Sequence, residues 1–479
     1  MGTRHAGVLL HPSSLPGPGP VGEIGPYAVA FLEWMTLAGL DTWQVLPLHP
    51  VGGGHSPYAS PSAFAADPRL ISVESLVVEG LLPSSPMPWG QEAMDPDAIE
   101  AWKMPLLREA AAKVAPTPEC RAWVATQDWL KDWALYSAVS RETASPWWTW
   151  GKVKRGDYAA EIAIAEGLQY LFSVQWGRLR EAARKRGIRI VGDLPIFVSH
   201  DACDVWAHRE LFLFDAEGRP DPVSGVPPDY FSPMGQRWAN PMYDWARHAR
   251  GKYAWWKARV RRELDLVDAV RLDHFRGFEA AWAIPADEPD ARNGKWTKGP
   301  GEALFRALAE DRGGELPFWA EDLGDITPEV TALRAGFQLP GMKILQFAFG
   351  TDGTHQFLPH NYVGTDWIAY TGTHDNDTAV GWYDAADDEV RHRFRVYTGR
   401  DGGDPAYGLL REAWASVADT AIAPMQDFLR LGSEARLNTP GVAAGNWAWR
   451  LRELPWRRVG GSRGWGLRSG GVDQVGQGA

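Results

Sequence analysis

The sequence of 479 residues predicts an α/β fold, a (β/α)8 TIM barrel with inserted, largely helical subdomains, forming a single catalytic unit over residues 1–479. Three observations predict it. Short apolar runs typical of buried strands recur along the chain, amphipathic stretches such as Ala28–Leu40 and Leu168–Arg186 separate them, and polar residues follow nearly every run. Because the active site of such a barrel lies at the carboxyl ends of its strands, the polar residues favour a barrel over a doubly wound sheet.

Seven of the apolar runs are clear candidate strands and an eighth is weaker. In order along the chain, the clear runs are Ala6–His11, Trp43–Leu48, Ile188–Phe197, Leu266–Phe275, Pro317–Leu323, Met342–Phe349 and Trp367–Thr373. The weaker run is Ala435–Thr439. Since the barrel needs eight strands, this run is expected to close it.

Long stretches between some runs predict insertions into the barrel. The second and third runs are too far apart for one loop and one helix, so a Trp-rich, largely helical subdomain is expected at about 70–165. Smaller insertions are expected at about 203–250 and 280–300. The end of the chain, 455–479, is rich in glycine and is expected to form an atypical or disordered tail.

Composition and charge restrict the class of partner. The net charge of −11 at pH 7 is unfavourable for binding a phosphate backbone, so no nucleic-acid partner is expected. No stretch approaches the length of a membrane span and the N-terminus has no apolar signal segment, so a cytoplasmic protein without membrane contact is predicted. The 26 Trp residues offer flat apolar faces that suit sugar rings, although many of them belong to the core.

No cofactor and no metal ion are predicted. Gly17–Gly22 has the spacing of a dinucleotide-binding fingerprint, but two prolines inside it lack the backbone N–H groups that a pyrophosphate needs. Cys120 and Cys203 are too few for a disulfide framework and have no paired zinc-ligand spacing, so both are interpreted as buried apolar residues. Ser199–Asp204 contains His and Cys but lacks a partner His at a diagnostic spacing.

Two of the runs end in carboxylates that suit acid–base chemistry. In the fourth run, strand alternation puts Arg271 and Asp273 on one face, where the guanidinium keeps the carboxylate ionised; a surface ion pair is the other interpretation. In the fifth run, Glu321 and Asp322 point to opposite faces, so only one enters the barrel mouth. The longer Glu321 is the preferred acid/base, since an apolar setting raises a carboxyl pKa; capping of the following helix is the alternative.

The seventh run leads into a loop that holds His374, Asp375, Asn376 and Asp377. Polar groups after a buried strand are costly unless they contact a ligand or each other. A hard metal ion needs more oxygen ligands than one loop supplies, so hydrogen bonds to sugar hydroxyls are the preferred interpretation. With the two preceding carboxylates, Asp375 completes a set for glycoside chemistry: one carboxylate attacks, a second exchanges protons and a third stabilises the flattened sugar ring. Retention further requires the first two to lie about 5–5.5 Å apart.

Several motifs follow one another in an order and spacing that identify a family. They are LLHPSSLPGP, WQVLPLHP followed by SPYAS, GDLPIFV, GVPPDYFSPMGQRWANP, VRLDHFRGF, AEDLG, GMKILQFAF, TGTHDNDT, and RLNTPG followed by GNWAWR. From about residue 4 to about residue 450 the chain resembles the amylomaltases, or 4-α-glucanotransferases, of the α-amylase clan.

The resemblance implies a distinct role for each carboxylate: Asp273 as nucleophile, Glu321 as acid/base and Asp375 as transition-state stabiliser. It implies sugar contacts from Arg271, His374, Ser56, Tyr58, Asp193, Asp229, Gln236, Trp238 and Asn438. It also implies a lid over the acceptor sites at Pro227–Gln236.

The chain departs from the family pattern in three places. The tripeptide Gly52-Gly53-Gly54 stands where the family often has an aromatic residue, which speaks against a secondary glucan-binding site there. Ala239 stands where the family usually has the glycine of a WGNP turn. Beyond Arg450, where the family has a helical segment, the chain continues into its Gly-rich tail.

The sequence therefore predicts a 4-α-glucanotransferase that moves an α-1,4-glucan segment to the 4-hydroxyl of an acceptor through a covalent glycosyl-enzyme. Maltooligosaccharides, amylose or starch-like α-glucans are the expected partners, and a monomer or weak homo-oligomer is the expected assembly. A retaining α-glucan hydrolase on the same barrel is the runner-up. A non-catalytic glucan-binding protein is disfavoured because three carboxylates each follow a strand of their own.

Overall fold

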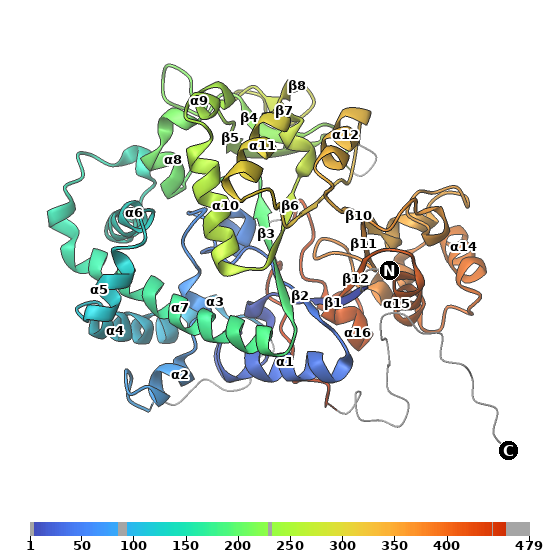
Figure 1. The fold of residues 1–479 in the computed structure, drawn as a ribbon, viewed down its shortest axis with the longest axis horizontal. Helices are drawn as coiled ribbons and strands as arrows, with labels where there is room; N and C mark the ends of the chain where they lie inside the picture. Colours follow the sequence, from blue (N-terminus) through green and yellow to red (C-terminus); the bar gives the residue numbers. More distant parts are fainter. Residues whose placement is uncertain (1–3, 85–92, 229–231, 443, 457–479) are drawn as a thin grey trace.

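The computed structural model describes residues 4–84, 93–228, 232–442 and 444–456. Eight parallel strands of this part of the chain close into a barrel in the order β1-β12-β11-β10-β9-β6-β3-β2 (Figure 1), which confirms the predicted fold class. Their bounds are β1 (His5–Leu9), β2 (Thr42–Gln44), β3 (Arg189–Pro195), β6 (Ala269–Asp273), β9 (Phe318–Ala320), β10 (Gly341–Ile344), β11 (Trp367–Tyr370) and β12 (Thr420–Pro424).

The eighth strand differs from the prediction. Ala435–Thr439 was expected to close the barrel, which is wrong: Ala435 ends a short 3-10 helix and the residues after it form a loop. The closing strand is β12, which is buried along its whole length and pairs with β1 and β11. Ala435 and Leu437 are nevertheless buried, because this loop packs on the barrel. Their apolar side chains explain why the segment was predicted as a strand.

Helices connect the barrel strands and cover their outer side. Their bounds are α1 (Pro26–Ala38), α7 (Ala159–Lys185), α10 (Ala254–Leu266), α11 (Glu302–Asp311), α12 (Pro328–Gly336), α13 (Ala379–Ala385), α14 (Asp388–Thr398), α15 (Pro405–Ala415) and α16 (Met425–Leu429). In α7 the buried side chains recur at helical spacing, as at Leu168, Phe172, Trp176 and Leu179. Burying each such side chain contributes about 1.5–3 kcal/mol to stability.

Further elements lie between the strands. The long segment between β2 and α7 holds α2 (Val73–Val78), α3 (Pro96–Ala98), α4 (Met104–Val114), α5 (Pro118–Val124) and α6 (Leu130–Thr143). Between β3 and α11 lie α8 (Cys203–Ala207), α9 (Trp245–Arg250) and four strands, β4 (Val223–Val226), β5 (Gln236–Pro241), β7 (Ala280–Ile284) and β8 (Lys295–Lys298). These strands form an antiparallel sheet in the order β5-β4-β7-β8, and Figure 1 shows it at the top of the barrel, with α4–α6 and α14–α15 on opposite sides.

Strand alternation decides which side chains enter the barrel. In β6, Val270 and Leu272 pack outward into the core under the helices, whereas Ala269 packs inward with Val191 and Tyr370 of neighbouring strands. Arg271 and Asp273 therefore share the inner face with Ala269. Within the described residues, no helix combines the length and the apolar character that crossing a bilayer requires.

Candidate active site

The register of β3 and β6 places a buried ion pair at the barrel mouth. Asp193 of β3 lies directly beside Arg271 of β6. Arg271 donates from Nη1 to both carboxylate oxygens of Asp193, at 2.9 and 2.7 Å, and its Nη2 lies 2.9 Å from Oδ1 of Asp273. Burial raises the pKa of Asp193 and Arg271 opposes that rise, while the two carboxylates hold the pKa of Arg271 well above its usual range. One guanidinium thus orients both carboxylates.

A tyrosine from a distant loop completes this network. Tyr58 donates its hydroxyl to Oδ2 of Asp193 at 2.7 Å, and burial raises its pKa well above the usual value, so it remains a donor. Its ring stacks on His374, with centroids 5.1 Å apart and planes at 16°, and Trp447 lies 5.8 Å away. Ser56 accepts a hydrogen bond from the Tyr58 backbone N–H at 3.2 Å, so it shapes the turn that presents the tyrosine.

Glu321 is joined to the end of β6 through the backbone. Its own N–H donates to the carbonyl of Leu272 at 3.1 Å, and its carbonyl accepts from Phe275 at 3.2 Å. Its side-chain Oε2 accepts a hydrogen bond from the backbone N–H of His274 at 2.8 Å. His274, which follows Asp273, has a left-handed backbone conformation (φ 51°). These bonds hold the Glu321 carboxylate against the backbone of His274, the residue that directly follows Asp273.

Burial raises the pKa of both Glu321 and its neighbour Asp322, but the two carboxyls have different partners. Burial raises the pKa of Glu321 well above its usual value; Arg271 opposes the rise, and the charges of Asp273 and Asp322 add to it. Asp322 instead accepts from the N–H of Met342 at 2.8 Å and lies 3.1 Å from Nε of Arg334. Asp322 therefore links strand β10 to helix α12, and Glu321 is the carboxyl suited to proton donation.

The loop after β11 brings His374 and Asp375 to the same mouth. Nε2 of His374 lies 3.3 Å from Oδ1 of Asp375, and burial lowers the pKa of His374, so the imidazole is neutral at pH 7. Oδ1 of Asp375 also accepts from the side-chain amide of Asn438 at 2.6 Å. The predicted contacts His374, Asp375 and Asn438 thus form one group.

Side chains that the sequence did not single out hold this loop. Asp427 of α16, which is fully buried, accepts from the hydroxyl of Thr371 at 2.5 Å and from the N–H of Ala379 at 2.7 Å, near the two ends of the loop. Arg436 donates to the carbonyl oxygens of Asp375 at 2.6 Å and Asn438 at 2.8 Å. The sequence signal for Asp427 is its position shortly after an apolar strand. That strand, β12, was not among the predicted strands, so Asp427 was not predicted.

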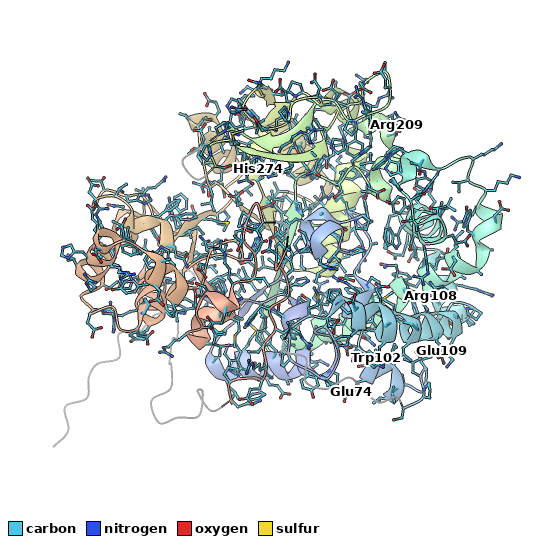
Figure 2. The ribbon with its side chains drawn as sticks, turned by 180° about the vertical axis from the view of Figure 1, so that it is seen from behind. Glu74, Trp102, Arg108, Glu109, Arg209 and His274 are labelled. Atoms are coloured by element: carbon cyan, nitrogen blue, oxygen red, sulfur yellow. The ribbon has the colours of Figure 1, made fainter. Side chains whose placement is uncertain are left out.

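The small sheet brings a tryptophan to the barrel mouth. Trp238 of β5 donates from Nε1 to the side-chain oxygen of Gln236 at 3.1 Å, and its ring meets the His274 ring edge to face at 4.8 Å. Figure 2 shows His274 directly below this sheet. The neighbouring Ala239 has a φ of 63°, a left-handed conformation that costs a residue with a Cβ free energy. Asp229, another predicted contact, lies outside the described residues, as does part of the predicted lid.

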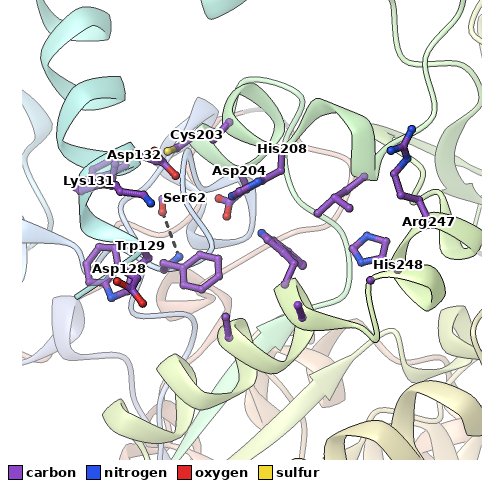
Figure 3. Close-up of a pocket in the computed structure, with 18 residues that line it drawn as sticks. Ser62, Asp128, Trp129, Lys131, Asp132, Cys203, Asp204, His208, Arg247 and His248 are labelled. Atoms are coloured by element: carbon purple, nitrogen blue, oxygen red, sulfur yellow. Dashed lines mark hydrogen bonds between the residues drawn. The ribbon is translucent and has the colours of Figure 1, made fainter. Parts of the chain in front are cut away.

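A separate cavity of about 370 Å³ lies between α6, α8, α9 and α10 (Figure 3). None of the predicted catalytic or sugar-binding residues lines it. The rings on its wall already contact one another, Phe64 with Trp129 at 6.5 Å and with Trp255 at 5.8 Å. This cavity belongs to the packing between the insertions and the barrel.

Comparison with known proteins identifies the family. Residues 10–455 match the model of glycoside hydrolase family 77, described as 4-alpha-glucanotransferase. The 4-alpha-glucanotransferase of Thermus thermophilus is 46% identical over 474 residues, which cover 94% of this chain and 95% of that protein. The 4-alpha-glucanotransferase of Synechocystis sp. is 42% identical over 475 residues, which cover 93% of this chain and 94% of that protein.

Solved structures agree with the sequence relatives. The amylomaltase of Streptococcus agalactiae, determined in complex with acarbose, has a TM-score of 0.90 at 34% identity, covering 94% of this chain and 95% of that one. The amylomaltase of Corynebacterium glutamicum, at 18% identity and a TM-score of 0.76, covers 94% of this chain and 71% of that one and supports the fold alone. The family predicted from the motifs is confirmed. The chain belongs to the 4-alpha-glucanotransferase family, glycoside hydrolase family 77, and acts as a transferase on α-glucans.

Proposed function

We propose that this transferase works by a retaining double displacement in which Asp273 attacks the anomeric carbon and Glu321 exchanges the protons. The observation that carries the proposal is the junction between β6 and β9, where the N–H of His274 holds the Glu321 carboxylate beside Asp273. The environment supports different roles for the two groups: Arg271 lies 2.9 Å from Asp273, whereas burial raises the pKa of Glu321.

In the first half of the reaction, Asp273 forms a covalent bond to the donor sugar as Glu321 protonates the departing 4-oxygen. In the second half, ionised Glu321 takes the proton of the acceptor 4-hydroxyl, which attacks the anomeric carbon and releases Asp273. Asp375 stabilises the positive charge that develops on the ring between these states, and neutral His374 donates to a sugar hydroxyl beside it. The side-chain amide of Asn438 orients Asp375 by donating a 2.6 Å hydrogen bond to its Oδ1.

The remaining predicted contacts fall into two proposed groups. Asp193, Arg271, Tyr58 and Ser56 form the floor of the donor site, and Gln236 and Trp238 border the acceptor site. Asp229 stays a predicted sugar contact. We propose maltooligosaccharides, amylose and starch-like chains as its α-glucan substrates, which agrees with acarbose in the structure of the relative from Streptococcus agalactiae. We also propose that barrel and insertions act as one catalytic unit. The cytoplasmic location, the monomer or weak homo-oligomer and the absence of nucleic-acid and membrane partners stay predictions.

Kinetics with maltotriose as donor and labelled glucose as acceptor test the mechanism. A covalent intermediate predicts parallel lines when the reciprocal rate is plotted against the reciprocal donor concentration at several fixed acceptor concentrations. Transfer also predicts that the label appears at the reducing end of a ladder of longer maltodextrins. Intersecting lines would exclude the double displacement. Reducing ends released in proportion to the bonds broken, without a ladder, would favour the hydrolase that the sequence left as runner-up.

A further inference from the structure

An exposed tryptophan is held on an aromatic base beside the barrel. Trp148 is 48% exposed, and its indole is parallel to the imidazole of His200, with centroids 4.2 Å apart and planes at 1°. Within the described part of the chain, the rings that contact Trp148 are His200 on one face and Trp147 at 84° to it. Among the described residues, no ring covers the other face of the indole. Trp148 and His200 are called the rim platform below.

One buried and one half-buried aromatic ring hold the base of the rim platform. Trp147 is buried and donates from Nε1 to the backbone carbonyl of His200 at 2.8 Å. The His200 ring also lies 5.9 Å from Phe214, over which the Arg209 guanidinium sits at 4.7 Å. Because these contacts orient the indole in the free protein, a ligand that stacks on it loses little additional side-chain entropy.

The rim platform lies on the catalytic face of the barrel. His200 follows the carboxyl end of β3 and Asp273 ends the adjacent strand β6, and parallel strands end at the same face. Phe197, in the same loop as His200, lies 6.4 Å from Trp238 of the small sheet. Figure 2 shows Arg209 and His274 towards the same end of the molecule. A polymer that leaves the barrel mouth past Trp238 can therefore continue towards the rim platform.

We propose that Trp148 stacks on a glucose unit of an α-glucan chain outside the catalytic subsites. A flat, amphipathic indole matches the apolar face of a sugar ring, and the substrates of this family are chains of such rings. A chain that occupies the mouth and the rim platform together gains affinity through its second contact, and the proposal includes that a trisaccharide in the mouth is too short to make this contact. The proposal rests on the α-glucan substrate and is independent of the roles assigned to the carboxylates.

The experiment compares Trp148→Ala with Trp296→Ala on short and long substrates. Trp296 is a matched control because it is 37% exposed but its ring face is already covered by Arg276 at 3.5 Å. We expect Trp148→Ala to raise KM for amylose by about 2- to 10-fold, the range that one aromatic stacking contact supplies. Its KM and kcat for maltotriose, and both parameters of Trp296→Ala on either substrate, are expected to match the wild type. Trp148→Phe should retain most of the amylose affinity.

Three results would overturn the proposal. An unchanged amylose KM in Trp148→Ala excludes the contact. An equal loss on amylose and maltotriose shows that Trp148 supports the fold instead. A change in elution volume on size exclusion shows that the rim platform is a contact between copies of the chain. The test does not depend on the roles proposed for Asp273 and Glu321, because it compares the KM values of one variant for amylose and for maltotriose.

Discussion

The two halves of the catalytic site are held in place by different means. Asp193, Arg271, Asp273 and Glu321, the strand-borne half, lie on or directly after barrel strands, where the pairing of neighbouring backbones sets their positions. His374, Asp375 and Asn438, the loop-borne half, lie on loops that side chains such as Asp427 and Arg436 tie down. The Asp375 side chain is 44% exposed and that of Asp273 is 28% exposed.

The difference shows which part of the site resists local change. In the strand-borne half, moving Asp273 relative to Asp193 requires breaking the ladder of β3 and β6. In the loop-borne half, a single buried carboxylate binds near both ends of the loop, so one substitution can shift Asp375 while the barrel stays intact. We therefore expect substitutions in the first half to act through chemistry and substitutions of the loop anchors to act through geometry.

The largest expected effect comes from removing the two strand-borne carboxyls. Asp273→Asn and Glu321→Gln should each lower kcat/KM on maltotriose by about 10³-fold or more, because each removes a reacting group. A maltosyl fluoride donor separates the two variants, since fluoride departs without a proton. Glu321→Gln should then release fluoride in a rapid first turnover and Asp273→Asn should not. The same fluoride release by both variants would contradict the assigned roles.

The pH profile sharpens the assignment of Glu321. Because burial raises its pKa well above the usual value, the carboxyl keeps its proton to a higher pH than an exposed glutamate does, and kcat/KM on maltotriose should fall as the pH rises through that pKa. With the fluoride donor the first step needs no proton, so this alkaline limb should disappear from pre-steady-state fluoride release. Persistence of the limb with both donors would assign it to another group.

A smaller effect is expected from the anchor of the loop-borne half. Asp427→Asn weakens the hydrogen bonds to Thr371 and Ala379 and should lower kcat by about 10- to 100-fold, since a displacement near 1 Å can cost about 100-fold. KM for maltotriose should change less than kcat. The control is Asp204→Asn, which alters a similarly buried carboxylate that accepts from the N–H of Ala63, away from the loop. Equal kcat losses in both variants would indicate a general effect of stability.

The smallest expected effect lies at the acceptor border. Ala239 adopts a left-handed φ of 63°, where the chain's family usually has glycine. Ala239→Gly relieves that strain but adds flexibility to the unfolded chain, so a net stabilisation of about 0.5–1 kcal/mol is expected. Denaturant unfolding measures this difference. A destabilised variant would show that neighbouring contacts favour the alanine.

The sequence could predict the strand-borne half because alternation is a local property. Arg271 and Asp273, two residues apart on one strand, share a face in any pairing, and Glu321 and Asp322 must diverge. The loop-borne anchors depended on recognising β12, a five-residue strand ending in proline, which only its pairing with β1 and β11 distinguishes from a loop. The hydrogen bond from Tyr58 to Asp193 and the small sheet likewise join distant segments, which no local pattern reveals.

The mass of a trapped intermediate tests the central claim most directly. The Glu321→Gln variant, incubated with maltosyl fluoride without acceptor and then digested, should carry one maltosyl unit on the peptide that contains Asp273, because the variant lacks the base for the second step. Adding maltotriose with azide, a nucleophile that needs no base, should remove the adduct. A maltosyl unit on a different carboxylate, or fluoride release without any adduct, would contradict Asp273 as the nucleophile.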